Sequence, residues 1–262
     1  MKAPDGFLEV HLRARRDGGA KLLLPYITGG IDPRWVDLVR SAADAGADAI
    51  EVGIPFSDPA MDGPTIQAAS ERALACGATP ASILDDVSRA DVDVPLVAMT
   101  YFNIVFRLGV ERFATEARDA GISGVILPDV PMEELGEWEP AATSAGLETV
   151  LLASPLTPPD RLTELVTRSQ GFVYGVNLLG VTGERSTVGD HAAALGARLK
   201  AATELPAVMG FGVSTPEQAV TVAAVADGVA VGSALMRRVL DGEGPLRVGR
   251  AIAELRGALD RG

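Results

Sequence analysis

Two carboxylates are the candidates for proton transfer in this sequence, and Glu51 has the more informative position. Alternation along residues 48–52 puts Glu51 on the same strand face as Ala49, opposite Ile50 and Val52. We expect the face with small Ala49 to point inward, where burial would raise the pKa of Glu51 toward neutrality and suit it to exchange protons. The alternative is a structural glutamate paired with a buried base, although none of the apolar runs defined below contains Lys, Arg or His.

Asp62 follows Glu51 after ten intervening residues, enough chain for a loop that returns over the same site. By itself Asp62 also fits a structural role, because Asp-Gly-Pro is a turn sequence and an acidic side chain is favourable just before a helix start. Two carboxylates in unlike surroundings can hold different pKa values and take different roles. We therefore expect Glu51 and Asp62 to belong to one site.

A phosphate site is predicted from glycines and helix starts late in the chain. Gly212 and Gly232 allow close backbone approach, while Ser233 and the segment 214–216 stand where helices are expected to begin. The free N–H groups of a helix start attract anions. The alternative for the segment 214–216 is a plain helix cap with proline at the first helical position, and both interpretations can hold together.

Other residues near strand ends leave two interpretations open. Residues 180–187 fit either a mobile lid or an ordinary surface loop. Tyr101, Tyr174 and Phe211 fit either the wall of an aromatic ligand's pocket or core aromatics at strand ends.

Residue types that are scarce or badly placed narrow the chemistry. The only lysines are Lys2, Lys21 and Lys200, and none ends an apolar run, so a Schiff base lacks its amine. The two histidines, His11 and His191, lie far apart, and no cluster has the spacing of metal ligands. A Gly-x-Ser-x-Gly nucleophile motif is also missing. Acid–base catalysis by carboxylates on a phosphorylated substrate, without a metal, remains.

The elements that must position these residues recur along the chain. Apolar runs rich in Val, Ile and Leu alternate with Ala-rich amphipathic segments, which indicates a parallel sheet covered on both faces. Eight such units, without Gly-x-Gly-x-x-Gly after the first run, favour a single (β/α)8 TIM barrel over residues 1–262 rather than an open doubly wound sheet. The predicted strands are 22–28, 48–52, 94–100, 123–128, 148–153, 172–177, 207–211 and 228–232.

Two segments lie outside this regular alternation. Residues 4–16 read as an extra N-terminal helix that closes the barrel floor, and residues 53–93 are long enough for a loop and two helices. Function in such barrels lies at the C-terminal ends of the strands, where both carboxylates and the glycines above would meet.

Composition excludes several classes of protein. With 262 residues, of which 47% are hydrophobic, the chain is not a disordered one. A net charge of −12 disfavours nucleic acid and anionic membranes as partners, and no uncharged stretch is long enough for a membrane helix. The single cysteine, Cys76, and an N-terminus without a signal peptide fit a cytoplasmic protein.

The longest motif of the chain is Glu51-Val-Gly-Ile-Pro-Phe-Ser-Asp-Pro-Ala-Met-Asp62-Gly-Pro-Thr-Ile-Gln67. Together with Gly180-Val-Thr-Gly183, Gly210-Phe-Gly212 and Gly232-Ser233, it resembles the tryptophan synthase alpha subunit family over essentially the whole chain. The resemblance implies a (β/α)8 barrel that cleaves indole-3-glycerol phosphate into indole and glyceraldehyde 3-phosphate. It also implies no cofactor on this chain and a pyridoxal-phosphate beta subunit as partner in an alpha2beta2 complex.

The resemblance further implies residue roles. Glu51 would protonate indole carbon 3 and then take the proton of the glycerol hydroxyl beside the breaking bond, while Asp62 would stabilise charge at the indole N–H. Of the supporting residues, Tyr174 would lie near Glu51, Thr182 would bind Asp62 from the lid, and Asp129 would steady the loop after residue 53. The phosphate cradle would comprise Gly183, Gly212, Gly232 and Ser233, and the indole pocket Tyr26, Tyr101 and Phe211.

The chain departs from the family pattern at two places. Leu178-Leu179 stand where many relatives carry polar residues, and Ala60-Met61 replaces the more usual Leu-Ala in the partner-facing loop. Both lie in elements that the family uses to close the site and signal to its partner. Two rival functions therefore stay open. One is a standalone indole-releasing lyase. The other is a non-catalytic regulatory subunit, which the presence of both carboxylates disfavours.

Overall fold

Eight parallel strands close into a barrel in sequence order, each bonded to the next and β8 bonded back to β1. The structure, a computed structural model, describes residues 6–176, 188–210 and 212–262. Glu51 pairs in register with Tyr26 on one neighbouring strand and with Val97 on the other. The strands are β1 (Leu22–Thr28), β2 (Ile50–Gly53), β3 (Leu96–Met99), β4 (Ile122–Ile126), β5 (Glu148–Ala153), β6 (Val173–Val176), β7 (Ala207–Gly210) and β8 (Gly228–Val231).

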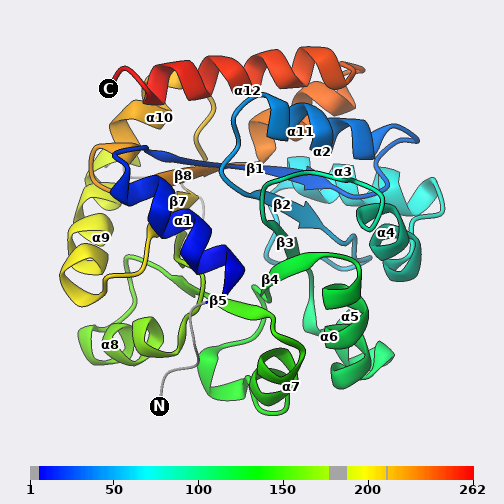
Figure 1. The fold of residues 1–262 in the computed structure, drawn as a ribbon, viewed down its shortest axis with the longest axis horizontal. Helices are drawn as coiled ribbons and strands as arrows, with labels where there is room; N and C mark the ends of the chain where they lie inside the picture. Colours follow the sequence, from blue (N-terminus) through cyan, green and yellow to red (C-terminus); the bar gives the residue numbers. More distant parts are fainter. Residues whose placement is uncertain (1–5, 177–187, 211) are drawn as a thin grey trace.

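Helices surround this barrel as an outer layer (Figure 1). The connection from β2 to β3 holds two of them, as the sequence predicts. The helices are α1 (Phe7–Asp17), α2 (Trp35–Asp44), α3 (Pro64–Ala75), α4 (Pro80–Val87), α5 (Phe102–Leu108), α6 (Val110–Asp119), α7 (Trp138–Ala145), α8 (Pro159–Arg168), α9 (Val188–Ala202), α10 (Pro216–Ala223), α11 (Ser233–Leu240) and α12 (Pro245–Leu259), with a 3-10 turn η1 (Met132–Glu134) after β4.

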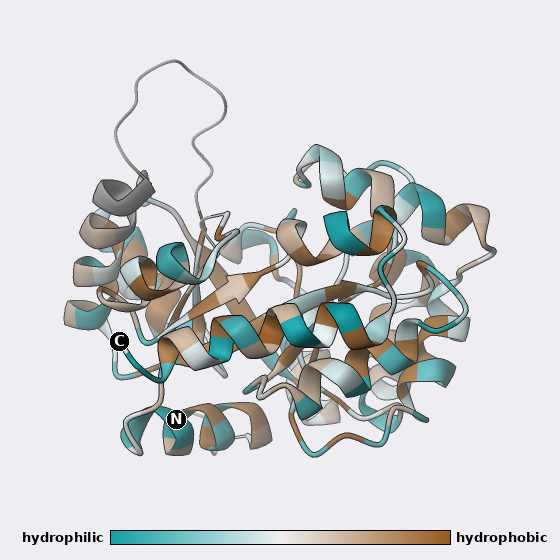
Figure 2. Ribbon diagram, turned by 90° about the horizontal axis from the view of Figure 1, so that it is seen from above, coloured by the Kyte–Doolittle hydropathy of each residue, from teal (hydrophilic) through white to brown (hydrophobic). Residues whose placement is uncertain are grey.

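The predicted N-terminal helix is confirmed as α1, which crosses the N-terminal end of the barrel (Figures 1 and 2). Its Leu8 and Leu12 are fully buried, and Leu8 packs against Gly124 and Gly171 at the starts of β4 and β6. Because α1 closes this end, the opposite, C-terminal end is the one left for a ligand.

Side chains along the strands alternate between two cores. Outward residues such as Ile50 and Val52 join the large core beneath the helices, whereas Ala49 faces inward, as its small size suggested. The inward core consists of Leu8, Leu12, Leu22, Leu24, Ala49, Val97, Ile126, Val150, Phe172, Tyr174, Val208 and Ala230. Since Glu51 lies two residues after Ala49, the same alternation sends its side chain into the barrel.

Several strands are shorter than the apolar runs that predict them. The strand expected at 94–100 begins only at Leu96, after Pro95, which has no N–H to give to a ladder. The strand expected at 48–52 begins at Ile50, and the carboxylate of Asp48 instead accepts the backbone N–H of Leu23 at 2.8 Å. Asp48 also pairs with Arg256 at 3.1 Å, so a buried charge at the barrel floor is neutralised.

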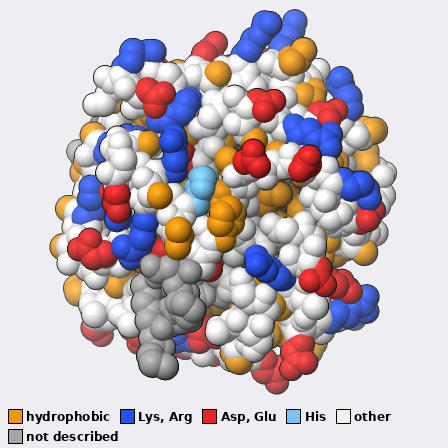
Figure 3. Space-filling model, viewed as in Figure 1, with side chains coloured by type: hydrophobic (Ala, Val, Ile, Leu, Met, Phe, Trp, Pro, Cys, Tyr) orange, Lys and Arg blue, Asp and Glu red, His pale blue; other side chains and the backbone are white. Residues whose placement is uncertain are grey.

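The surface carries charges of both signs. On the face covered by α1, Lys and Arg side chains are interspersed with Asp and Glu rather than gathered in one patch (Figure 3). Among the described residues, no helix combines the length and the apolar character needed to cross a membrane.

Candidate active site

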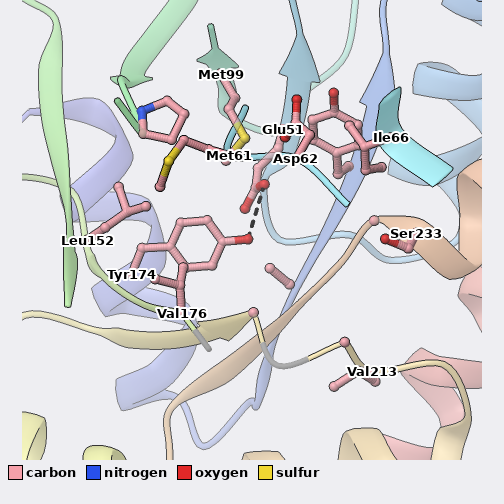
Figure 4. Close-up of a pocket in the computed structure, with 16 residues that line it drawn as sticks. Glu51, Met61, Asp62, Ile66, Met99, Leu152, Tyr174, Val176, Val213 and Ser233 are labelled. Atoms are coloured by element: carbon pink, nitrogen blue, oxygen red, sulfur yellow. Dashed lines mark hydrogen bonds between the residues drawn. The ribbon is translucent and has the colours of Figure 1, made fainter. Parts of the chain in front are cut away.

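A cavity of about 220 Å³ opens at the C-terminal end of the barrel and holds both candidate carboxylates (Figure 4). Most of its wall consists of the last inward-facing residue of each strand and the residues that follow. The described lining is Tyr26, Glu51, Met61, Asp62, Ile66, Met99, Pro128, Leu152, Tyr174, Val176, Gly210, Gly212, Val213, Ala230, Gly232 and Ser233.

Glu51 projects from β2 into this cavity and is 1% exposed. Its Oε2 accepts a hydrogen bond from the Tyr174 hydroxyl at 3.4 Å, whereas its Oε1 is buried without a partner among the described residues. Burial raises the pKa of Glu51 to about 8, and the bond from Tyr174 opposes the rise. At neutral pH Glu51 is therefore mainly a carboxylic acid, with an unpaired oxygen in a ligand-sized space.

Asp62 reaches the same cavity from the end of the loop 54–63, which returns over the barrel mouth as its length suggested. It stands two residues before α3, and its backbone oxygen accepts the side-chain N–H of Gln67 at 2.9 Å. Burial raises the pKa of Asp62 to about 6, and the Tyr101 hydroxyl opposes the rise. At neutral pH Asp62 is therefore mainly ionised, so the two carboxylates hold opposite protonation states side by side.

Tyr26 lines the cavity next to Glu51 on the neighbouring strand. A side chain at Gly53 would place its Cβ only 2.0 Å from the Tyr26 hydroxyl, so glycine at this position makes room for the phenol. The hydroxyl also lies 3.4 Å from the Oγ1 of Thr28.

Glycines and one serine line the cavity where β7 and β8 end. Gly212 has a φ of +69°, a conformation that favours glycine, and Gly232 precedes α11, whose first residue is Ser233. The first N–H groups of α11 have no partner within the helix, so they can receive an anion. In the segment 214–216 the Thr215 side chain accepts the N–H of Gln218. This segment therefore forms the helix cap that was the alternative to a phosphate site.

Two expected residues lie elsewhere. Tyr101 is buried but is not part of the described lining; its ring stacks on Phe56, with centroids 5.2 Å apart. Among the described residues Asp129 contacts the loop 54–63 by no hydrogen bond of its own, and its carboxylate accepts the backbone N–H of Phe102 at 3.1 Å. Thr182, Gly183, Phe211 and Leu178-Leu179 lie outside the described residues.

Several lining residues were not singled out from the sequence, namely Ile66, Met99, Pro128, Leu152, Val176, Val213 and Ala230, and Met61 was noted only as a departure from the family pattern. Met99, Leu152 and Val176 share a face with residues of the inward core. The period of two along each strand was therefore the signal that would have identified these three residues.

Groups for metal or amine chemistry do not converge on the site. The described residues contain no cluster of three or more His, Cys, Asp or Glu side chains fit to hold a metal ion. Lys21 donates to the backbone oxygen of Ala226, and Lys200 pairs with Asp227, both at the floor end of the barrel.

Comparisons with known proteins identify the family of the chain. The family model for the tryptophan synthase alpha chain matches residues 12–255. The tryptophan synthase alpha chain of Citrifermentans bemidjiense is 46% identical over 227 residues, which is 85% of either chain. That of Streptomyces avermitilis is 40% identical over 96% of this chain and 92% of its own.

Solved structures give the same result for the fold. The alpha subunit from Legionella pneumophila superposes with a TM-score of 0.90 at 34% identity, covering 98% of this chain and all of that one. A chain of tryptophan synthase from Mycobacterium tuberculosis gives 0.89 at 36% identity, over 98% and 99% of the two chains. The chain therefore belongs to the tryptophan synthase alpha chain family, lyases that cleave indole-3-glycerol phosphate to indole and glyceraldehyde 3-phosphate.

Proposed function

We propose that this chain performs the reaction of its family with Glu51 as acid and then base and Asp62 as the fixed negative charge. The observation that carries the proposal is the pair itself: a carboxylic acid and a carboxylate that line one cavity, with pKa values of about 8 and about 6. Intact carboxylates in one cavity also count against a non-catalytic regulatory subunit.

The chemistry needs one group to donate and then accept a proton. Indole is a poor leaving group until carbon 3 is protonated, so Glu51 gives its proton to that carbon and positive charge develops at the ring nitrogen. Asp62 accepts the N–H and stabilises that charge. The Glu51 carboxylate then removes the proton of the adjacent glycerol hydroxyl. A carbonyl forms at the carbon that carried this hydroxyl, and the carbon–carbon bond to the indole breaks. The electron pair of the broken bond returns to the indole ring. Glu51 ends as an acid again.

The substrate's phosphate would lie at the glycine side of the cavity. Gly212, Gly232 and Ser233 support this placement, because backbone N–H groups at the start of α11 attract an anion without a basic side chain. Tyr26 and Tyr174 would lie on either side of the carboxylates, and Thr182, Gly183 and Phe211 would complete the lid, cradle and indole wall as the family resemblance implies.

No cofactor on this chain enters the proposal, because Glu51 handles both protons and Asp62 supplies the only charge that the ring requires. Pyridoxal phosphate would belong to the partner. Members of the family work with a beta subunit, and we propose an alpha2beta2 complex in the cytoplasm.

The pH dependence of the isolated chain tests the catalytic assignment. We expect kcat/KM for indole release to be bell-shaped, falling below about pH 6 as Asp62 is protonated and above about pH 8 as Glu51 loses its proton. The substrate phosphate also titrates near pH 6, so the limb due to Asp62 is identified by its loss in Asp62→Asn. A rate that keeps rising above pH 9 would contradict Glu51 as the acid.

Adding a beta subunit tests the partner. Native mass spectrometry should show two copies of each chain, and indole formation should increase strongly, whereas an unchanged rate without a complex would favour the standalone lyase. Phe106 is 67% exposed on α5, the helix that follows the C-terminal end of β3, and Phe106→Ser should weaken the complex without changing indole release by the isolated chain.

A further inference from the structure

Tyr101 joins the end of β3 to the loop that carries Asp62. Its ring stacks on Phe56 at the start of that loop, at an angle of 28° between the planes, and its hydroxyl accepts the backbone N–H of Met61 at 2.9 Å. Both ends of the loop are thus held by one side chain, although Tyr101 does not line the cavity. Tyr101 therefore stands behind the described lining of the cavity, in contact with the loop that forms part of it.

The proton of the Tyr101 hydroxyl has a destination in Asp62. A phenol that accepts one N–H still has its own proton to donate, and Asp62 is the residue directly after Met61. The effect on Asp62 is visible in its titration, since the Tyr101 hydroxyl lowers the pKa that burial raises. Burial, and after it the charge of Asp62, raise the pKa of Tyr101 above its ordinary value, so the phenol keeps its proton throughout the working range of pH.

Tyr101 is itself held from the next strand. It is the last residue before α5, and the carboxylate of Asp129 accepts the N–H of Phe102, the first residue of that helix, at 3.1 Å. Asp129 therefore supports the backbone beside Tyr101, and through Tyr101 it is connected to the loop 54–63.

We propose that Tyr101 is a positioning residue for Asp62: its ring holds the start of the loop through Phe56, and its hydroxyl fixes the end of the loop through the Met61 N–H and donates toward the Asp62 carboxylate, so that this carboxylate stays directed at the substrate. The inference rests on the proposed role of Asp62 and extends it to a residue behind the cavity wall. The Tyr101 ring holds the loop 54–63 in place, and the Tyr101 hydroxyl favours the charged form of Asp62.

Among the described residues, Tyr101 is the one side chain whose hydrogen bond lowers the pKa of Asp62. The titratable side chains around it are Tyr26 from β1, Glu51 from β2, Tyr174 from β6 and, through Tyr101, Asp129 after β4. No Lys, Arg or His belongs to the described cavity lining. Tyr26 is near Asp62, but its hydroxyl contacts Thr28 and does not contribute to the titration of Asp62.

Tyr101→Phe tests the proposal, because phenylalanine keeps the ring on Phe56 and removes only the hydroxyl. Carboxyl-carbon NMR of the whole chain labelled at aspartate, with Asp62→Asn to assign the signal, measures the pKa of Asp62 directly. We expect this pKa to rise by roughly one unit in Tyr101→Phe, since a hydrogen bond to the charged form is lost. The kcat/KM for indole release should then fall roughly fivefold more at pH 6 than at pH 8.

Tyr26→Phe is the matched control, since it removes another phenol near the carboxylates and should leave the titration of Asp62 unchanged. Two results would overturn the proposal: an Asp62 titration that is the same in Tyr101→Phe as in the natural chain, or an equal shift in Tyr26→Phe. Failure of the proposed function would look different. In that case Asp62→Asn would turn over normally, while the NMR titration would still report whether Tyr101 acts on Asp62.

Discussion

Replacing Glu51 by glutamine should lower kcat for indole release by on the order of 10³–10⁴-fold and leave substrate binding nearly unchanged. Glutamine keeps the shape of the side chain and can still accept the bond from the Tyr174 hydroxyl. Glutamine has no acidic proton to donate, so indole carbon 3 stays unprotonated. It also cannot act as the base that deprotonates the glycerol hydroxyl. Turnover should be measured at saturating substrate, and binding by calorimetry with an analogue that lacks the reacting hydroxyl.

A second buried glutamate provides the control for this loss. Glu148 lies at the opposite end of the barrel, where its carboxylate accepts the N–H groups of Leu8 and Glu9 at the start of α1. Glu148→Gln should cost stability while kcat changes little. Full turnover by Glu51→Gln, or an equal loss in both variants, would refute acid–base catalysis at Glu51.

Glu51→Gln should also stabilise the fold at alkaline pH. The pKa of Glu51 is about 8 in the folded chain against an ordinary 4.5, so the folded state retains a proton that the unfolded state releases. The free energy of unfolding therefore falls as pH rises from about 4.5 to about 8, and glutamine does not incur this loss. At pH 8 and above we expect Glu51→Gln to be more stable by about 2–5 kcal/mol in urea titrations, and equal to the natural chain near pH 4.

Asp62→Asn should lower kcat/KM by on the order of 10²–10³-fold, a smaller loss than that of Glu51→Gln. The asparagine carbonyl can still accept the indole N–H, so part of the orientation survives, but the negative charge opposite the developing cation is gone. The fall in rate below about pH 6 that belongs to Asp62 should disappear in the same variant.

Asp58 offers a matched control in the same loop. It is exposed, and its carboxylate accepts a bond from Ser57 at 2.6 Å rather than reaching the cavity. Asp58→Asn should leave indole release by the isolated chain within about twofold, because an exposed interaction of this kind contributes little. If Asp62→Asn were as active as Asp58→Asn, Asp62 would return to the role of a turn residue.

Much of the architecture was determined by the sequence alone, because its signals are local. Apolar runs separated by glycine turns predicted all eight strands, and alternation around Ala49 predicted the face on which Glu51 lies. The helix at the barrel floor was predicted from residues 4–16, and the two helices between β2 and β3 from the length of the segment 53–93. The activity itself came from the long motif 51–67, because no local physical rule names a substrate.

Tertiary structure alone decided what lies behind the site. The position at a strand end shows that Tyr101 is near the barrel mouth. The direction of its side chain depends on how Phe56 and Met61, forty or more residues earlier, fold back against it. The same holds for Asp129, whose partner on α5 depends on the neighbouring strand rather than on its own sequence. Periodicity fixes the face of a residue within one element, whereas the contact between two loops depends on packing that only the closed barrel imposes.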